Sequence, residues 1–178
     1  MKFLILWAVS FVLSVSVSAQ TAVKPASKAQ QPTFDAVDMQ GKRVDTAALK
    51  GKVVVLNLWF INCPNCIQEI KMLNQLVDEY KGNKDVVFVG LAASTKSELQ
   101  RFLAKNPFKY QIVPDATMII LTKFGTPDKS GEINVPFPMH YVLDRDGIVA
   151  VKAQGIKGID FVKNELKRQF PESARAGN

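Results

Sequence analysis

Hydrophobic residues along this chain follow two spacings, and each spacing predicts a different kind of secondary structure. Short continuous apolar runs rich in β-branched residues indicate strands that are buried on both faces. Apolar residues that recur every three or four positions indicate amphipathic helices. The predicted strands cover residues 53–60, 86–91, 110–113, 139–143 and 148–153. The predicted helices cover residues 67–80, 95–106, 116–124 and 159–170.

Turn and capping residues sharpen several of these boundaries. Thr95 and Glu98 have the spacing of a capping box, which begins a helix. The segment 144–147, Asp-Arg-Asp-Gly, is a strong hairpin signal between the last two predicted strands. Residues 33–45 predict a short hairpin that turns at residues 39–41. The polar segment 126–134 predicts a surface loop.

The order of these elements predicts one α/β domain over residues 32–172. A strand, a helix and a second strand early in the chain form a parallel βαβ unit. The last two strands form an antiparallel hairpin instead. We therefore expect a central mixed β-sheet flanked by helices on both faces, with an N-terminal β-hairpin before it.

The N-terminal residues 1–19 have the pattern of a signal peptide. Lys2 precedes an apolar stretch that is interrupted only by serines, and Ala19 offers a small residue for cleavage. A retained membrane anchor is the alternative, although the serines and the modest length make a span marginal. Either outcome places the domain outside the cytoplasm, in the periplasm or on the extracytoplasmic face of the membrane. Residues 20–31 predict a flexible linker, and residues 173–178 a disordered tail.

Composition and charge narrow the classes of partner. Of the 178 residues, 47% are hydrophobic and 22% are charged, which is ordinary for a globular domain. The net charge of +7 comes from basic residues scattered along the chain. Because no basic run is interleaved with aromatic residues, we expect a solvated basic surface and no nucleic-acid partner. We also expect a monomer without a cofactor or a bound metal.

The chemistry of the chain is concentrated in two cysteines, Cys63 and Cys66, which follow the first buried strand directly. A structural disulfide is one interpretation, but a bridge across two residues closes a very short loop and removes little entropy from the unfolded chain. A helix N-terminus, by contrast, favours the thiolate that attacks in disulfide exchange. We expect Cys63 to be the exposed nucleophile and Cys66 the more buried resolving thiol. Pro64 fits the first helical position, where no N–H is needed.

The segment from Trp59 to Cys66, Trp-Phe-Ile-Asn-Cys-Pro-Asn-Cys, resembles the active-site segment of the thioredoxin superfamily. It is most similar to exported thiol–disulfide oxidoreductases of the ResA/TlpA type, whose lead-in resembles residues 41–43 and 49–53. The resemblance covers residues 32–170 and implies an α/β thioredoxin-like fold with an N-terminal β-hairpin extension. It implies exchange of the Cys63–Cys66 pair with exported proteins that carry a disulfide or a dithiol, and a membrane or periplasmic electron donor.

The same resemblance implies roles for residues outside the cysteine motif. A proline that is cis in these folds faces the disulfide, and Pro138 fits it, although an ordinary turn proline is the alternative. Phe137, Pro138 and Trp59 are the implied substrate-binding residues. Glu69 matches a glutamate placed near the thiols, where it would raise the pKa of the thiols by charge repulsion and could relay protons. An exposed helix glutamate paired with a lysine is the alternative.

Some positions differ from the pattern of this family. Asn57 lies in mid-strand, where thioredoxins proper have a buried acid. Lys71 replaces a frequent proline, and the residues between the cysteines are Pro64 and Asn65. The loop at residues 126–134 has the character of an insertion before Pro138.

Two other functions use a related fold and remain as alternatives. A peroxidase of the peroxiredoxin type needs a hydroxyl three positions before its reactive cysteine, and that position is Phe60 here. A Sco-like copper-binding protein would use Cys63, Cys66 and His140, since soft thiolates select Cu(I). Strand alternation places either Met139 or His140 toward the cysteines, but not both.

Overall fold

The computed structural model describes residues 32–171. The predicted signal peptide (1–19), linker (20–31) and tail (173–178) lie outside the described residues. Within residues 32–171, no helix is long and apolar enough to cross a membrane.

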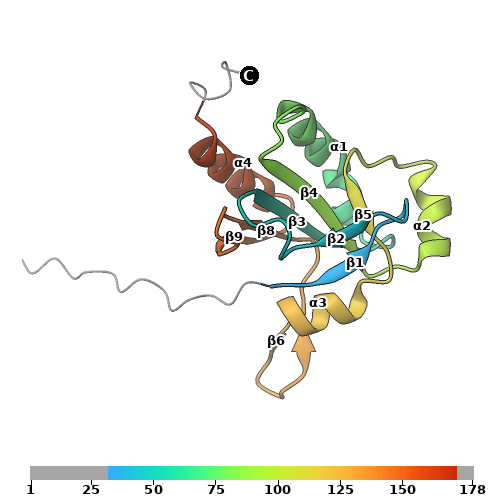
Figure 1. Ribbon diagram of the computed structural model, residues 1–178. Coiled ribbons are helices and arrows are strands. Elements are labelled where there is room, and N and C mark those ends of the chain that lie inside the picture. The colour runs from blue at the N-terminus through green and yellow to red at the C-terminus, as the bar shows by residue number, and fades with distance from the viewer. Residues whose placement is uncertain (1–31, 172–178) are drawn as a thin grey trace, which may run out of the picture.

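The centre of the fold is a five-stranded mixed sheet in the order β5-β4-β3-β8-β9 (Figure 1). β3 pairs in parallel with β4, and β4 in parallel with β5, whereas β8 is antiparallel to both β3 and β9. The strands are β3 (Val53–Trp59), β4 (Val86–Ala92), β5 (Gln111–Val113), β8 (Met139–Leu143) and β9 (Val149–Gln154). The helices are α1 (Pro64–Glu79), α2 (Lys96–Leu103), α3 (Thr117–Phe124) and α4 (Gly158–Gln169). Each of these strands and helices lies where the apolar pattern predicts it. The parallel and antiparallel pairs confirm the expected mixed sheet.

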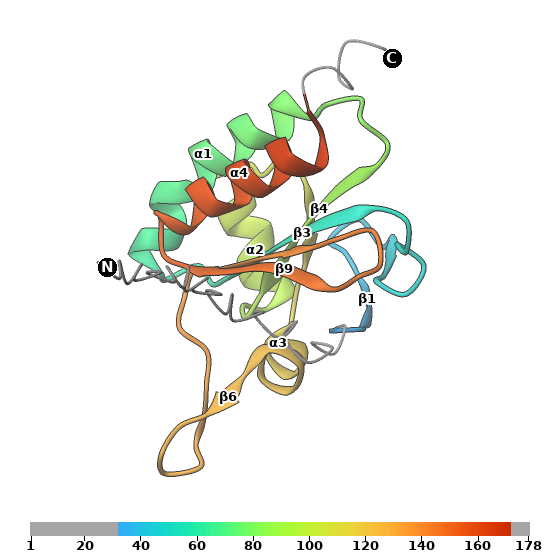
Figure 2. The same cartoon turned by 90° about the vertical axis from the view of Figure 1, so that its left-hand side faces the viewer.

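Alternation along β3 divides its side chains between two hydrophobic clusters. Val54, Leu56 and Leu58 pack in the cluster that contains α3, whereas Val53 and Val55 pack in the cluster that contains α1 and α4. Figure 2 shows α1 and α4 side by side over one face of the sheet and α3 on the opposite face. Helices therefore cover β3 on both faces, which explains why its sequence is an almost unbroken apolar run.

The N-terminal hairpin forms as predicted from β1 (Asp35–Val37) and β2 (Arg43–Asp45). Its turn includes Gly41 with φ +82°, a conformation that glycine adopts without strain. The buried Asp38 accepts hydrogen bonds from the backbone N–H of Gln40 (2.9 Å) and of Lys42 (2.8 Å). Asp38 also accepts from Gln111 of β5 (3.1 Å), so its carboxylate ties the hairpin to the edge of the main sheet.

The segment 126–134 is not the irregular loop that we predicted. It forms a small antiparallel ribbon of β6 (Thr126–Pro127) and β7 (Ile133–Asn134), which projects away from the body of the domain (Figures 1 and 2). Asp128 stabilises its tip, because one carboxylate oxygen accepts from the N–H of Ser130 (2.8 Å) and of Glu132 (3.1 Å). These polar turn contacts produce a ribbon without the apolar alternation by which a strand is recognised in a sequence.

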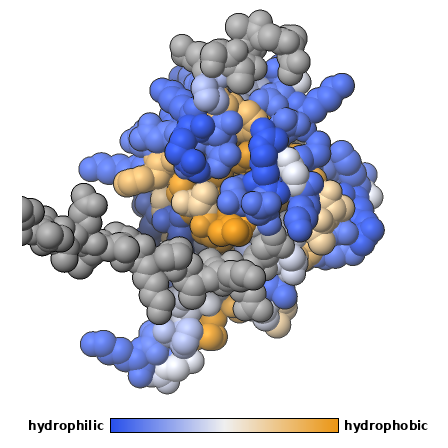
Figure 3. All heavy atoms as spheres, turned by 60° about the vertical axis from the view of Figure 1, so that its left-hand side comes forward, coloured by the Kyte–Doolittle hydropathy of each residue, from blue (hydrophilic) through white to orange (hydrophobic). Residues whose placement is uncertain are grey.

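Hydrophilic side chains form most of the surface on the face shown in Figure 3, where they surround an apolar area. Seven large hydrophobic side chains in residues 32–171 are exposed, and two of them, Ile67 and Met72, lie on α1. The seven are Val37, Ile67, Met72, Met118, Ile133, Ile148 and Phe161. Single exposed apolar residues of this kind are usual in soluble domains.

Candidate redox site

Cys63 and Cys66 form a disulfide at the point where β3 ends and α1 begins. Cys63 is the N-cap residue of α1, and its sulfur accepts a hydrogen bond from the backbone N–H of Cys66 at 3.2 Å. Pro64 occupies the first helical position, as predicted. Our expectation of an exposed Cys63 is not met in this oxidised form: Cys63 is 4% exposed and Cys66 is 2% exposed. The bond to Cys66 holds Cys63 in the apolar cluster below the loop.

Two hydrogen bonds connect the loop between β3 and α1 to the segment after β4. The N–H of Ile61 donates to the hydroxyl oxygen of the buried Ser94 at 3.1 Å. The N–H of Ala93 donates to the carbonyl of Trp59 at 2.9 Å. The disulfide is therefore fixed at the carboxyl ends of two parallel strands, which is where α/β sheets place their functional sites.

Trp59 lies beneath the cysteines and does not reach the surface. Its ring stacks on Phe108 with a centroid distance of 4.6 Å and contacts Phe102 at 5.6 Å. The side chain is only 1% exposed, although we expected it to contact substrate. Apolar side chains from α2 and the following connection cover the indole, so Trp59 supports the cysteine loop from below.

Phe137 and Pro138 lie at the same end of the sheet as the cysteines. β8 begins at Met139, which is paired with Leu58, so Pro138 lies opposite the last residue of β3, Trp59. The Phe137–Pro138 peptide bond is cis, as the resemblance implied. The ring of Phe137 contacts Phe60 edge-on at 5.2 Å. The two loops therefore meet beside the disulfide although they are distant in sequence.

Polar side chains form a buried cluster beneath the cysteines, on the face covered by α1 and α4. Glu69 lies three residues after Cys66 in α1 and is 1% exposed, which excludes the alternative of an exposed helix glutamate. One of its oxygens, Oε1, accepts a hydrogen bond from Asn57 Nδ2 at 2.9 Å. The other, Oε2, lies 3.2 Å from Nε2 of His140, which is 0% exposed. Strand alternation thus directs His140 to this cluster, whereas Met139 packs in the opposite core.

Tyr110 is the fourth member of this buried cluster. Its hydroxyl donates to Asn57 Oδ1 at 3.2 Å. Burial and the nearby charge of Glu69 raise the pKa of Tyr110 well above its usual value, so this phenol is neutral near pH 7. Tyr110 and His140 could not be assigned to the cluster from the sequence, because their positions depend on how distant strands pair.

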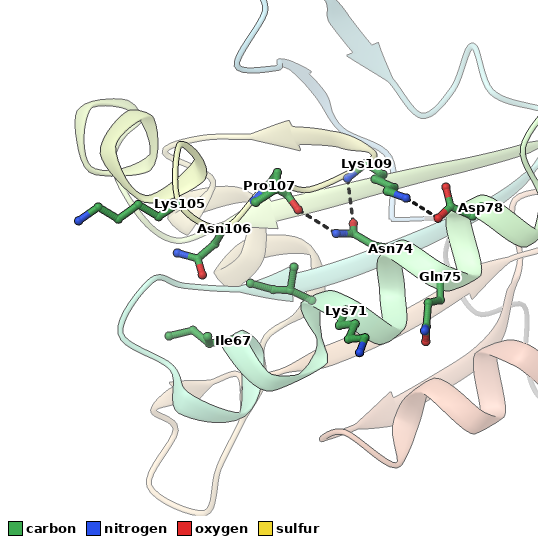
Figure 4. Close-up of a pocket in the computed structure, with 10 residues that line it drawn as sticks. Ile67, Lys71, Asn74, Gln75, Asp78, Lys105, Asn106, Pro107 and Lys109 are labelled. Atoms are coloured by element: carbon green, nitrogen blue, oxygen red, sulfur yellow. Dashed lines mark hydrogen bonds and ion pairs between the residues drawn. The ribbon is translucent and has the colours of Figure 1, made fainter.

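A groove of about 430 Å³ runs along α1 beside the cysteines, between this helix and the connection from α2 to β5. Figure 4 shows Asn74 bridging the groove: its Nδ2 donates to the carbonyl of Pro107 (2.8 Å), and its Oδ1 accepts from the N–H of Lys109 (2.9 Å). Lys109 also pairs with Asp78. Lys71, the departure from the family's proline, lines this groove on the exposed side of α1.

Comparison with known proteins identifies the family. The AhpC/TSA family matches residues 27–152, which is more than half of the chain. The chain belongs to this family. A thioredoxin-like protein of Bacillus subtilis, YneN, is 32% identical over 145 residues, with 79% of this chain and 76% of YneN covered. The thiol-disulfide oxidoreductase ResA of Bacillus anthracis is 28% identical over 143 residues, with 80% of this chain and 78% of ResA covered.

Solved structures confirm the thioredoxin-like fold of this AhpC/TSA member. A thiol:disulfide interchange protein from Chlorobium tepidum matches with a TM-score of 0.64 at 21% identity, covering 80% of this chain and 98% of that protein. StoA from Bacillus subtilis matches with a TM-score of 0.60 at 18% identity, covering 76% and 97%. At these identities the structural likeness extends to the fold alone.

The site of this AhpC/TSA chain does not favour either alternative function. The peroxidase alternative lacks its hydroxyl, because Phe60 occupies the required position and packs against Phe137. The copper alternative requires His140 beside the sulfurs, but that imidazole is buried next to Glu69. Within residues 32–171, no group of three or more His, Cys, Asp or Glu side chains could hold a metal ion.

Proposed function

We propose that this chain is an exported thiol–disulfide oxidoreductase that exchanges its Cys63–Cys66 pair with protein partners. The observation that carries the proposal is the disulfide across the N-terminus of α1, with Cys63 as the N-cap. The unpaired N–H groups and the dipole of a helix N-terminus stabilise a thiolate there. The same N–H of Cys66 that contacts the Cys63 sulfur at 3.2 Å is available to that thiolate.

In the proposed reaction, the Cys63 thiolate attacks one sulfur of a partner disulfide. A bond forms between Cys63 and that sulfur, and the other partner sulfur leaves as a thiolate that takes a proton from solvent. The Cys66 thiol then loses its proton and attacks Cys63. The Cys63–Cys66 bond forms, the second partner sulfur leaves and is protonated, and two electrons have passed to the partner.

Phe137 and Pro138 form the proposed contact surface for the partner chain. Pro138 carries no N–H, so the backbone before it can approach the sulfurs without directing a donor at them. An extended partner segment can pair with this backbone in the manner of an added strand. Trp59 contributes from below by fixing the cysteine loop.

We propose reduction of partners as the physiological direction. A strong oxidant needs a strongly stabilised thiolate. Here the first turn of α1 adds only the uncharged Pro64 and Asn65 next to the cysteines, so no basic side chain there reinforces the helix N-terminus. A periplasmic or other extracytoplasmic location agrees with the secretion of a relative, the soluble secreted antigen MPT53 of Mycobacterium bovis, which is 32% identical over 95 residues. An exported partner disulfide and a membrane or periplasmic electron donor complete the proposal.

The test uses the full chain and two single substitutions. Cys63→Ser should abolish reduction of a model protein disulfide such as insulin. Cys66→Ser should accumulate a mixed disulfide through Cys63, visible by mass spectrometry under non-reducing conditions. Phe161→Ser, at a side chain of α4 that is 62% exposed, is a matched control and should retain the parent rate. Full activity in Cys63→Ser would overturn the proposal.

A further inference from the structure

His140 is a buried titratable group that the proposed exchange reaction does not use. It lies on β8 directly opposite Asn57 of β3, and the two side chains approach the same carboxyl group from neighbouring strands. Asn57 donates to Oε1 of Glu69, whereas Oε2 faces His140. The first residue of α4 closes over the imidazole, because a Cβ at Gly158 would lie 2.7 Å from Cδ2 of His140.

The facing atoms of the two groups, Glu69 Oε2 and His140 Nε2, fit one shared proton, whereas Nδ1 of His140 has no hydrogen-bond partner in residues 32–171. Glu69 Oε2 and His140 Nε2 are 3.2 Å apart, yet neither has an aligned hydrogen bond to any other group in residues 32–171. With no proton between them, a carboxylate would be left uncompensated in an apolar site, which is costly. With one proton, either a neutral acid and a neutral imidazole or an ion pair results, and both arrangements have zero net charge.

The other groups around the pair do not supply a compensating charge. Asn57 is neutral, Tyr110 is a neutral phenol near pH 7, and Ala153 of β9 is the strand partner of His140 on its other side. The first turn of α4 contributes Gly158 and Ile159 to the interior, while its Asp160 is exposed. The one other buried charged side chain in residues 32–171 is Asp38, which is bonded to the N-terminal hairpin and to Gln111.

We propose that His140 is a positioning residue that shares one proton with Glu69 and so keeps the net charge beneath Cys66 at zero. The effect of this shared proton on disulfide exchange rests on the proposed function. The sharing of the proton by Glu69 and His140 does not depend on it. Glu69 follows Cys66 by one helical turn on the same buried face of α1. A bare carboxylate at that position would oppose formation of the Cys66 thiolate by like-charge repulsion. His140 removes this repulsion while the carboxyl group remains in place.

The reactivity of Cys66 tests the proposal without any partner protein. In a Cys63→Ser background Cys66 is the only thiol, because the chain has two cysteines. Adding His140→Gln should slow alkylation of Cys66 by iodoacetamide about tenfold at pH 7, equivalent to about one unit in its pH profile. Adding His140→Gln to a Glu69→Gln protein should change the rate less than about twofold, because the effect acts through Glu69. Equal slowing in both backgrounds, or none in either, would overturn the proposal.

The imidazole can also be observed directly. His140 is the only histidine of the chain, so every side-chain signal in a ¹⁵N spectrum of histidine-labelled, untagged protein belongs to it. The nitrogen shifts of His140 should change on Glu69→Gln, because the shared proton then moves to one partner. Unchanged shifts would contradict the sharing. This measurement keeps His140 itself, so it decides the question even where His140→Gln does not fold. If the chain lacks exchange activity but shows the coupling between His140 and Glu69, only the proposed function is refuted and the shared proton stands.

Discussion

Asn57 and His140 are paired across two antiparallel strands, and their side chains meet at the two oxygens of one buried carboxyl group. That carboxyl group belongs to Glu69, a buried residue of α1. The strand position holds an amide that donates to it. The polar cluster beneath the disulfide therefore depends on an amide at residue 57.

Asn57→Asp should destabilise the domain, because it replaces a donor at 2.9 Å from Glu69 by a second carboxyl group. We expect the free energy of unfolding to fall by about 3 kcal/mol at pH 7, from the lost hydrogen bond and from repulsion. Chemical denaturation measures the change. The loss should shrink at acid pH, where the introduced carboxyl group is protonated and can donate. A loss that is independent of pH would show that repulsion is not its cause.

Asn74→Ala should weaken the attachment of the segment between α2 and β5 to α1. Its amide makes two hydrogen bonds across the groove, at 2.8 and 2.9 Å. Losing both should cost about 1–2 kcal/mol and speed amide exchange at Lys109. Gln75→Ala, at the exposed neighbouring position on α1, is the control and should change stability by less than about 0.5 kcal/mol. Similar losses in the two variants would mean that the bridge contributes nothing of its own.

Gly125→Ala should disturb the base of the ribbon. An added Cβ would lie 2.4 Å from the carbonyl oxygen of Leu121 and 2.4 Å from Cγ2 of Ile133. We expect a loss of about 1–3 kcal/mol, typical of overpacking. Trypsin should also cleave faster after Lys129 at the tip of the ribbon. Thr126→Ala, at an exposed neighbour, should leave both measurements near those of the parent protein.

Tyr141→Phe should make the domain more resistant to alkali. Burial raises the pKa of Tyr141 to about 12 in the folded protein, and the side chain is only 4% exposed. In the unfolded chain a tyrosine ionises near pH 10. The contribution of the neutral phenol is therefore complete below pH 10 and is lost as the pH rises from 10 to 12, by about 3 kcal/mol. Unfolding followed at several pH values should show a shallower decline in the variant. An identical decline would assign alkaline unfolding to other groups.

Much of this fold follows from local patterns, whereas the site depends on contacts between distant segments. The apolar run from Val53 to Trp59 is enough to predict β3, and the capping box at Thr95 is enough to predict the start of α2. The position of Cys63 at the helix N-cap also follows from sequence order. The burial of Trp59 does not, because it depends on how α2 packs over the indole. The approach of His140 to Glu69 likewise depends on the register of β8 against β3.

The ribbon of β6 and β7 leads directly into Val135 and the Phe137–Pro138 segment, and its two strands hydrogen-bond to each other and to no strand of the main sheet. New residues grafted at Lys129 would therefore be carried on a separate arm that projects from the domain. A short recognition peptide inserted at that tip offers a way to redirect the protein to a chosen client while every strand that holds the redox pair keeps its neighbours.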